Sequence, residues 1–207
     1  MDWDNLPLTS EDLFGEFLDM SSEDSGPFEA VILPLQELVV YPQMMTPLYV
    51  GREASIQALE VAVHEDWPLV VVTQRDPTLE TYPNAADLYD IGTEVIIARS
   101  IRLPDGTSSA IAQGTGRVRI LEYTQTEPYL IATVEPLTEV KGEDDALTEA
   151  LMRAILTMFE KAVNLNQALP EEAYIYAMNI ESPGQLADVI AQMINLPLEA
   201  RQDLLET

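Results

Sequence analysis

The chain of 207 residues lacks cysteine and has one histidine, His64. Without cysteine there is no disulfide framework, no thiolate zinc site and no cysteine nucleophile, and one histidine cannot build a multi-histidine metal cage. His64 ends an expected helix, beside Glu65, so it is either a general base or a cation at the negative end of the helix dipole, and we favour the second. We therefore expect no metal and no cofactor. The lack of cysteine also agrees with a cytoplasmic location.

Basic residues are scarce, because ten Lys and Arg face 36 Asp and Glu, for a net charge of −26. Binding to phosphate depends on basic side chains, so we expect neither nucleic acid nor an anionic membrane as a partner. Residues 1–29 contain nine acids and no base, which excludes a secretory signal. The apolar runs fall far short of the roughly 20 residues that span a bilayer, so we expect a soluble chain.

Motifs for catalysis are also missing. The sequence has neither a G-x-x-x-x-G-K-[ST] phosphate loop nor a G-x-S-x-G nucleophile turn. The Gly114-Thr115-Gly116 stretch precedes a strand rather than a helix, so it predicts a bend in a sheet and not a dinucleotide site. The acids at 143–145 lack the alternating spacing of a calcium loop and predict a solvated hinge. We expect no catalytic residue in this chain.

The charge and pattern of the first 29 residues set them apart from the rest. Ser21–Pro27 has the composition of a linker, and we expect residues 1–29 to form an acidic, largely disordered leader. One short element is the exception. Four apolar residues at helical spacing could form one or two amphipathic turns on docking; they are Leu13, Phe14, Phe17 and Leu18.

The residue pattern of 30–140 predicts mainly strands. The Asp105-Gly106 pair predicts a hairpin that joins strands 94–102 and 108–114. Along the first of these, simple alternation puts Val95, Ile97, Arg99 and Ile101 on one face and Ile96 and Ala98 on the other. One helix with Ile56, Leu59 and Val63 on its apolar side interrupts the strands and stops at Pro68.

Residues 141–207 change to the helical period. Apolar residues at every fourth position predict a long amphipathic helix over about 146–165. Shorter helices are expected after Pro170, from the Ser182-Pro183 cap and over Leu198–Glu206. The last has no C-cap before Thr207, which predicts that the natural chain continues. The whole layout, a β-rich domain followed by a helical one, is that of an α+β protein.

One apolar segment, Leu38–Val50, is the candidate binding site. Its prolines, Pro42 and Pro47, disfavour a central strand, so part of it should be loop or edge strand. Adjacent methionines on such a loop present soft surface that adapts to many partners. The candidate residues are Tyr41, Met44, Met45, Leu48 and Tyr49. The alternative is that Met44 and Met45 fill the core.

A family resemblance runs through the same residues. The ordered motifs resemble the opening of the amino-terminal domain of ATP-dependent Lon proteases and cover residues 30–207. The motifs that carry it are Leu33-Pro34-Leu35, Val39-Val40-Tyr41-Pro42, Met44, Pro47-Leu48, Val50-Gly51-Arg52, Ser55-Ile56, Ala58-Leu59-Glu60, Gln74-Arg75-Asp76, Asp87-Leu88-Tyr89, Ile91-Gly92-Thr93, Leu103-Pro104-Asp105-Gly106-Thr107, Gly114, Arg117-Val118, Pro183-Gly184, Leu186-Ala187-Asp188 and Leu204-Leu205-Glu206. Gln36-Glu37 departs from the family, which usually has Arg followed by Asp or Asn there.

The resemblance implies a PUA-like, partly closed β-barrel followed by an α-helical bundle. In full Lon enzymes this region precedes an ATPase domain and a Ser-Lys protease domain, and the enzyme is a hexamer. The chain would then be the non-catalytic part that binds unfolded or damaged proteins for degradation. Two alternatives stay open. The region could instead assemble or space the hexamer through its contacts with other Lon subunits, or it could be a free-standing Lon-type adaptor.

Overall fold

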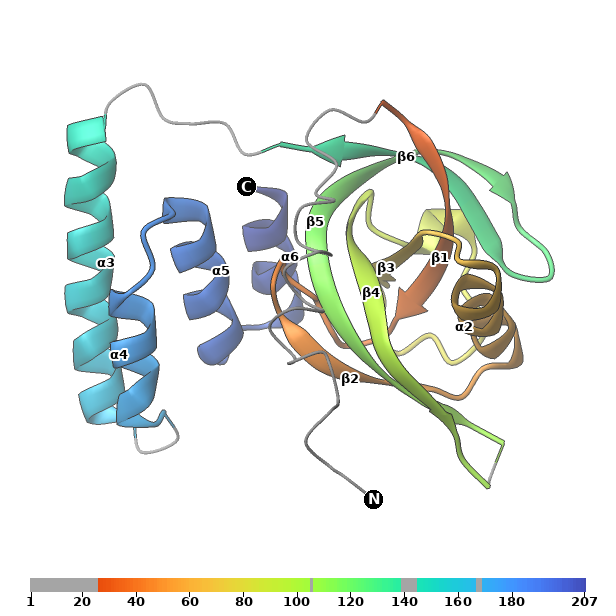
Figure 1. Cartoon of the computed structure of the whole chain (residues 1–207), viewed down its shortest axis with the longest axis horizontal. Helices are drawn as coiled ribbons and strands as arrows, with labels where there is room; N and C mark the ends of the chain where they lie inside the picture. The colour runs from red at the N-terminus through yellow and green to blue at the C-terminus, as the bar shows by residue number, and fades with distance from the viewer. Residues whose placement is uncertain (1–25, 105, 139–144, 167–168) are drawn as a thin grey trace, which may run out of the picture.

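The computed structural model describes residues 26–104, 106–138, 145–166 and 169–207. The amphipathic leader motif, Asp105 and the acids at 143 and 144 therefore lie outside the described residues. The elements, in chain order (Figure 1), are β1 (Phe28–Leu35), β2 (Met45–Val50), α2 (Glu53–Glu65), β3 (Leu69–Thr73), the 3-10 turn η1 (Ala85–Asp87), β4 (Ile91–Arg102), β5 (Ser108–Gln125), β6 (Leu130–Leu137), α3 (Asp145–Leu165), α4 (Glu171–Met178), α5 (Pro183–Met193) and α6 (Leu198–Glu206).

The strands of the described residues form one mixed sheet in the order β2-β5-β4-β3-β1-β6. The β1–β3 pair is parallel and the others are antiparallel. A further pairing of β5 with β6 joins the ends of the five strands β5-β4-β3-β1-β6, so each of these has a neighbour on both sides. Among the described strands, only β2 pairs with a single strand, as its proline predicts. Strand plus helix content confirms the α+β class, while the PUA-like assignment stays a prediction.

The predicted hairpin is confirmed. β4 and β5 pair antiparallel, and the Leu103 amide N–H donates to the Thr107 carbonyl oxygen at 2.8 Å. Gly106 has φ of 90°, a conformation that costs glycine little and other residues more. Farther along, Glu94 pairs with Gly116 but the next residue, Val95, pairs with Gly114. Thr115 is therefore an extra residue, a β-bulge, and it lies inside β5, which continues to Gln125, so the expected bend between two separate strands is a bulge within one strand.

The interior is apolar on both sides of the central strands. All five residues of β3 are buried, as expected for a strand covered on both faces. One cluster packs Ile56 and Leu59 of α2 against the sheet, and a second surrounds Ile32 and Val118. Helix α2 ends at Asp66 in the left-handed conformation, two residues before Pro68, where the sequence predicted its end.

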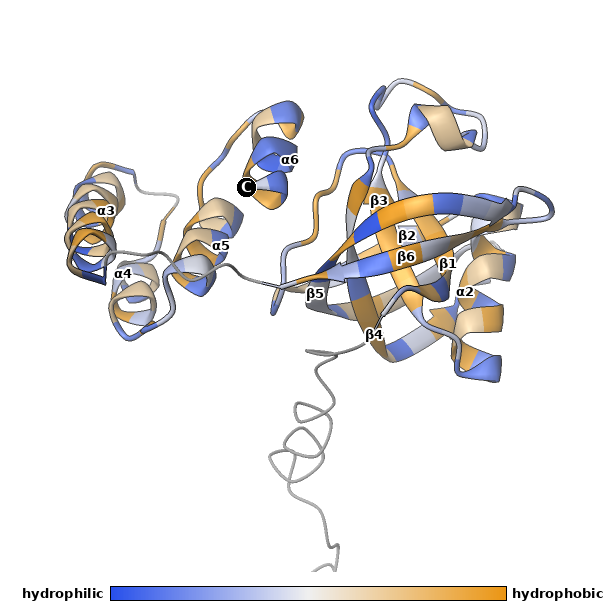
Figure 2. Ribbon diagram, turned by 90° about the horizontal axis from the view of Figure 1, so that it is seen from above, coloured by the Kyte–Doolittle hydropathy of each residue, from blue (hydrophilic) through white to orange (hydrophobic). Residues whose placement is uncertain are grey.

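The helices of the second half form where the patterns predicted them. The Ser182 hydroxyl accepts the Gln185 amide N–H at 3.3 Å with Pro183 at the first helical position, whereas Pro170 is the N-cap of α4 rather than part of its first turn. Phe159 and Val163 of α3 pack with α4 and α5 in a core of their own. Helices α3 and α4 lie far from the sheet, with α5 and α6 between (Figures 1 and 2).

Candidate functional site

The five residues of the predicted binding segment divide between the surface and the core. Met45 is 59% exposed and Tyr49 is 79% exposed, whereas Tyr41 and Leu48 are each 1% exposed. Met44 is half-buried between two core clusters. The expectation of one exposed surface made of all five is therefore not met. Leu48 alternates with its exposed strand neighbours and points inward, and Tyr41 lies beneath α5 and α6.

The exposed residues of β2 continue across two more strands. Met45, Pro47 and Tyr49 pair with Gln113, Ile111 and Ser109 of β5, and these pair in turn with Ile96, Arg99 and Ile101 of β4. Residues opposite one another lie on the same side of a sheet, so the three rows share one outer face. We call this surface the β2 face and define it by its exposed apolar members, Met45, Pro47, Tyr49, Ile96, Ile101 and Ile111.

A second bulge decides the β4 part of this face. The register shifts between Ile97, which pairs with Ala112, and Arg99, which pairs with Ile111. The extra residue moves Arg99 and everything after it to the other side of the strand. Arg99 and Ile101 therefore share the side of Ile96, and the expectation from simple alternation is wrong beyond the bulge.

The β2 face is poor in acids although the chain is rich in them. Its three segments, Met45–Val50, Ile96–Arg102 and Ser108–Gln113, contain no Asp or Glu and two Arg. Arg102 forms an exposed ion pair with Glu60 at 2.8 Å. Arg99 is exposed and has no ion-pair partner in the part of the chain that the structure describes. The surface is thus apolar with one unpaired positive charge on its β4 row, beside Ile111.

Backbone contacts hold the start of β2 in place. The Gln43 amide donates to the Gly114 carbonyl at 2.8 Å, and the Gly114 amide donates to the Met44 carbonyl at 2.9 Å. A Cβ at Gly114 would collide with the carbonyl oxygen of Tyr41, so only glycine allows this close approach. The Thr93 hydroxyl also donates to the Val40 carbonyl at 2.5 Å. The β2 face is therefore positioned before any partner arrives.

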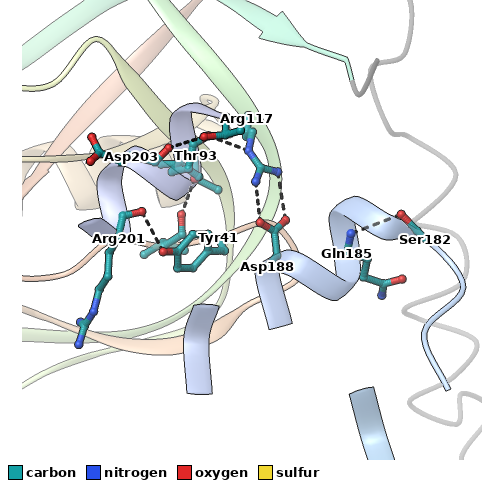
Figure 3. Close-up of polar contacts among 11 residues, drawn as sticks. Tyr41, Thr93, Arg117, Ser182, Gln185, Asp188, Arg201 and Asp203 are labelled. Atoms are coloured by element: carbon teal, nitrogen blue, oxygen red, sulfur yellow. Dashed lines mark hydrogen bonds and ion pairs between the residues drawn. The ribbon is translucent and has the colours of Figure 1, made fainter. Parts of the chain in front are cut away.

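A cluster of polar contacts, which we call the polar joint, connects Tyr41 and the strand β5 to the helices α5 and α6 (Figure 3). Both guanidinium NH2 groups of Arg117 face the Asp188 carboxylate, with one contact at 3.0 Å, and the two side chains are 17% and 5% exposed. Arg117 Nε donates to the Leu205 carbonyl, and the Tyr41 hydroxyl donates to the Arg201 carbonyl, both at 2.8 Å. Burial raises the pKa of Tyr41 to about 12, against the opposing effect of the Arg201 charge.

A second apolar surface lies on α3, beside the face that packs in the helical core. It consists of exposed residues at helical spacing, which we call the α3 stripe: Leu147, Leu151, Ile155 and Met158. The inner side of α3 carries Phe159 and Val163 in the helical core. The apolar part of α3 is thus wider than the face that α4 and α5 cover.

The described residues offer little for chemistry. They contain no cluster of three or more His, Cys, Asp or Glu side chains that could hold a metal ion. His64 is exposed in the last turn of α2, the position predicted for a cation at a helix end. None of the helices in the described ranges is long and apolar enough to cross a bilayer.

Comparison with known sequences agrees with the resemblance. Residues 29–207 match the family model described as the ATP-dependent protease La (LON) substrate-binding domain. The chain is 46% identical over 176 residues to a Lon protease of Dictyoglomus thermophilum, which covers 85% of this chain and 22% of that protein. It is 41% identical over 178 residues to Lon protease 2 of Herpetosiphon aurantiacus, covering 86% of this chain and 22% of the relative. The chain therefore spans about a fifth of the length of these relatives.

Solved structures share the fold. The N-terminal domain of Mycobacterium avium complex Lon protease superposes with a TM-score of 0.65 at 21% identity, over 87% of this chain and 90% of that one. A Lon N-terminal domain protein from Xanthomonas campestris gives a TM-score of 0.58 at 17% identity, with the same coverage of 87% and 90%.

Proposed function

Because the chain belongs to the family of Lon substrate-binding domains, we propose that its β2 face binds unfolded or damaged protein segments for an ATP-dependent protease. The observation that carries the proposal is the β2 face itself, where six apolar side chains are exposed on three hydrogen-bonded strands. Cleavage and ATP hydrolysis belong, in this proposal, to other parts of a cytoplasmic Lon enzyme, so the chain engages substrate without cutting it.

Hydrophobic burial explains how such a surface distinguishes unfolded from folded proteins. An unfolded polypeptide exposes apolar side chains that a folded protein hides, so an apolar surface selects by exposure rather than by sequence. Burying one or two side chains stabilises a complex by about 1.5–3 kcal/mol each before entropic costs, so one domain binds weakly. Six copies in the hexamer that the resemblance implies would bind the same chain more tightly through avidity.

The proposed site keeps two residues of the sequence prediction and gives the others different roles. Met45 and Tyr49 are exposed and contact substrate, with Met45 supplying a flexible thioether side chain. Tyr41, Leu48 and the half-buried Met44 support β2 from below. Ile96, Ile101 and Ile111 extend the contact area beyond the segment that the sequence indicated.

Substitution on the β2 face tests the proposal. In the double variant M45S/Y49S, affinity for a fluorescently labelled, permanently unfolded protein should fall about tenfold or more, because two contact side chains lose apolar area. Fluorescence anisotropy measures this, and thermal unfolding checks that the fold is intact. The matched control is L151S/M158S, which removes two exposed apolar side chains from the α3 stripe. Equal losses in both variants, or no loss in M45S/Y49S, would refute a role for the β2 face.

The α3 stripe favours a second function, assembly with other Lon subunits. An exposed apolar stripe on a helix that is already packed on its other side is typical of a surface that meets another helix. Sedimentation velocity of the chain over a range of concentrations tests this. Self-association that L151S/M158S abolishes and M45S/Y49S leaves unchanged would support assembly, whereas a monomer at all concentrations would argue against it for this chain.

A further inference from the structure

The amphipathic leader motif has a complementary surface on the same chain. Residues 11–19 contain four apolar side chains, four acids and no base. We propose that this segment docks intramolecularly on the β2 face and competes there with unfolded substrate. The competition rests on the proposed function, whereas the docking does not.

Hydrophobic complementarity is the first argument. Leu13, Phe14, Phe17 and Leu18 are spaced to share one side of a helical turn. The β2 face offers six exposed apolar side chains from three strands, a surface suited to a short apolar segment of any sequence. A segment tethered to the same chain is always present at high effective concentration, so it can occupy such a surface even when its intrinsic affinity is low.

Charge favours the β2 face over the α3 stripe. The leader segment is acidic through Glu11, Asp12, Glu16 and Asp19. The three segments that form the β2 face contain no acid and carry the unpaired Arg99, and Glu94 lies beyond Ile96 at the border of the face. By contrast, α3 carries three exposed acids, Asp145, Glu149 and Glu160, against two bases, Arg153 and Lys161, and Glu149 pairs with Arg153. The small net negative charge of α3 disfavours the acidic leader, whereas Arg99 favours it at the β2 face.

The length of the connecting chain permits the contact. Phe28 and Ile120 both pair with Val134, so β1 begins two strands away from Ile120 of β5. Ile111 lies nine positions before Ile120 on β5, which is about 30 Å along a strand, and two strand spacings of about 4.8 Å bring the separation to about 32 Å. The ten residues from Leu18 to Phe28 span about 33–36 Å when extended. Leu18 therefore reaches Ile111 when the linker is nearly fully extended.

Methyl NMR on the full chain tests the docking directly. With labelled Ile and Met methyl groups, the variant F14S/F17S should shift the resonances of Met45, Ile96, Ile101 and Ile111, because the rings that cover them are gone. Ile155 and Met158 on α3 serve as internal controls and should not move. A matched leader variant, L6S/L8S, removes two apolar side chains outside the motif and should leave the β2 face signals nearly unchanged.

Concentration and charge complete the test of docking. The shifts should be the same at about 50 and about 500 μM, because the contact is within one chain. R99Q should reproduce part of the F14S/F17S shift, whereas R119Q, which removes an exposed charge elsewhere on β5, should not. Unchanged β2 face resonances in F14S/F17S would overturn the docking. Shifts that grow with concentration would also overturn it in favour of contact between two copies.

Substrate affinity separates the docking from the proposed function. If the leader covers the β2 face for two thirds to nine tenths of the time, F14S/F17S should tighten binding of an unfolded protein about threefold to tenfold. Methyl shifts without any tightening would support docking and overturn the competition. No methyl shifts, together with binding that M45S/Y49S weakens, would overturn the docking and leave the substrate role of the β2 face intact.

Discussion

The β2 face and the α3 stripe differ in backbone, charge and support. The β2 face belongs to three hydrogen-bonded strands, has no acid and is fastened from below by Gly114 and the Tyr41 segment. The α3 stripe belongs to one helix with acids beside it and lies far from the sheet (Figure 1). A rigid, acid-free face suits varied extended segments, whereas a helical stripe suits one regular partner. Similar exposure of apolar side chains thus supports two different kinds of contact.

Breaking the polar joint between the sheet and the helices α5 and α6 should have the largest effect on the free energy of unfolding. In Asp188→Ala, the guanidinium of Arg117 stays buried without its carboxylate, and the free energy of unfolding should fall by about 3–5 kcal/mol. Denaturant titration followed by circular dichroism measures this. The matched control is Glu149→Ala, which breaks the exposed pair with Arg153 and should cost no more than about 0.5 kcal/mol. A loss of similar size in both variants would show that the joint is not special.

Disturbing the backbone contacts of Gly114 at the start of β2 should weaken binding at the β2 face and leave the α3 stripe unchanged. In Gly114→Ala, the new methyl group collides with the Tyr41 carbonyl, so the free energy of unfolding should fall by about 1–3 kcal/mol and affinity for unfolded protein should weaken. The α3 stripe and any association through it should not change. Gly116→Ala is the control, because no atom lies within 4 Å of its added Cβ, and it should change stability by less than about 0.5 kcal/mol. Equal effects of the two alanines would contradict the anchoring role.

The smallest expected effect comes from the Tyr41 hydroxyl and depends on pH. Tyr41→Phe removes the hydrogen bond to the Arg201 carbonyl and should lower the free energy of unfolding by about 1 kcal/mol at pH 8. Because folding raises the pKa of Tyr41 from 10.0 to about 12, the unfolded chain loses this proton first as the pH rises. The advantage of the wild type is therefore complete below pH 10 and shrinks between pH 10 and 12. A constant difference across this range, measured by denaturant titration, would contradict the assignment.

Much of the local structure was predictable because its causes are local. The Ser182-Pro183 cap, the Gly106 turn and the end of α2 before Pro68 each depend on residues within a few positions of one another. The edge position of β2 also followed from Pro47, whose nitrogen cannot donate to a second neighbour. The exposure of Met45 and Tyr49 follows from the same edge position, whereas their role in binding stays a prediction.

The misassigned residues depend on contacts that are distant in sequence. Tyr41 resembles an exposed loop residue until α6, 160 positions later, covers its hydroxyl. Ile96 and Ile101 share a face only because a bulge intervenes, and nothing in their own alternation signals it. The partner of Arg117 lies 71 residues away on α5. Inspection of neighbouring residues in the sequence could not have joined these pairs.

The sequence by itself determined the charge of the chain, the β4–β5 hairpin, the helices of the second half and the choice of loop or edge strand for part of Leu38–Val50. Period and turn chemistry act over a few residues, so these properties are encoded where they occur. Only the tertiary structure decided which apolar residues stay exposed together. A shared face requires the register of three strands and the docking of α5 and α6, and those are set by the packing of the whole core rather than by any one segment.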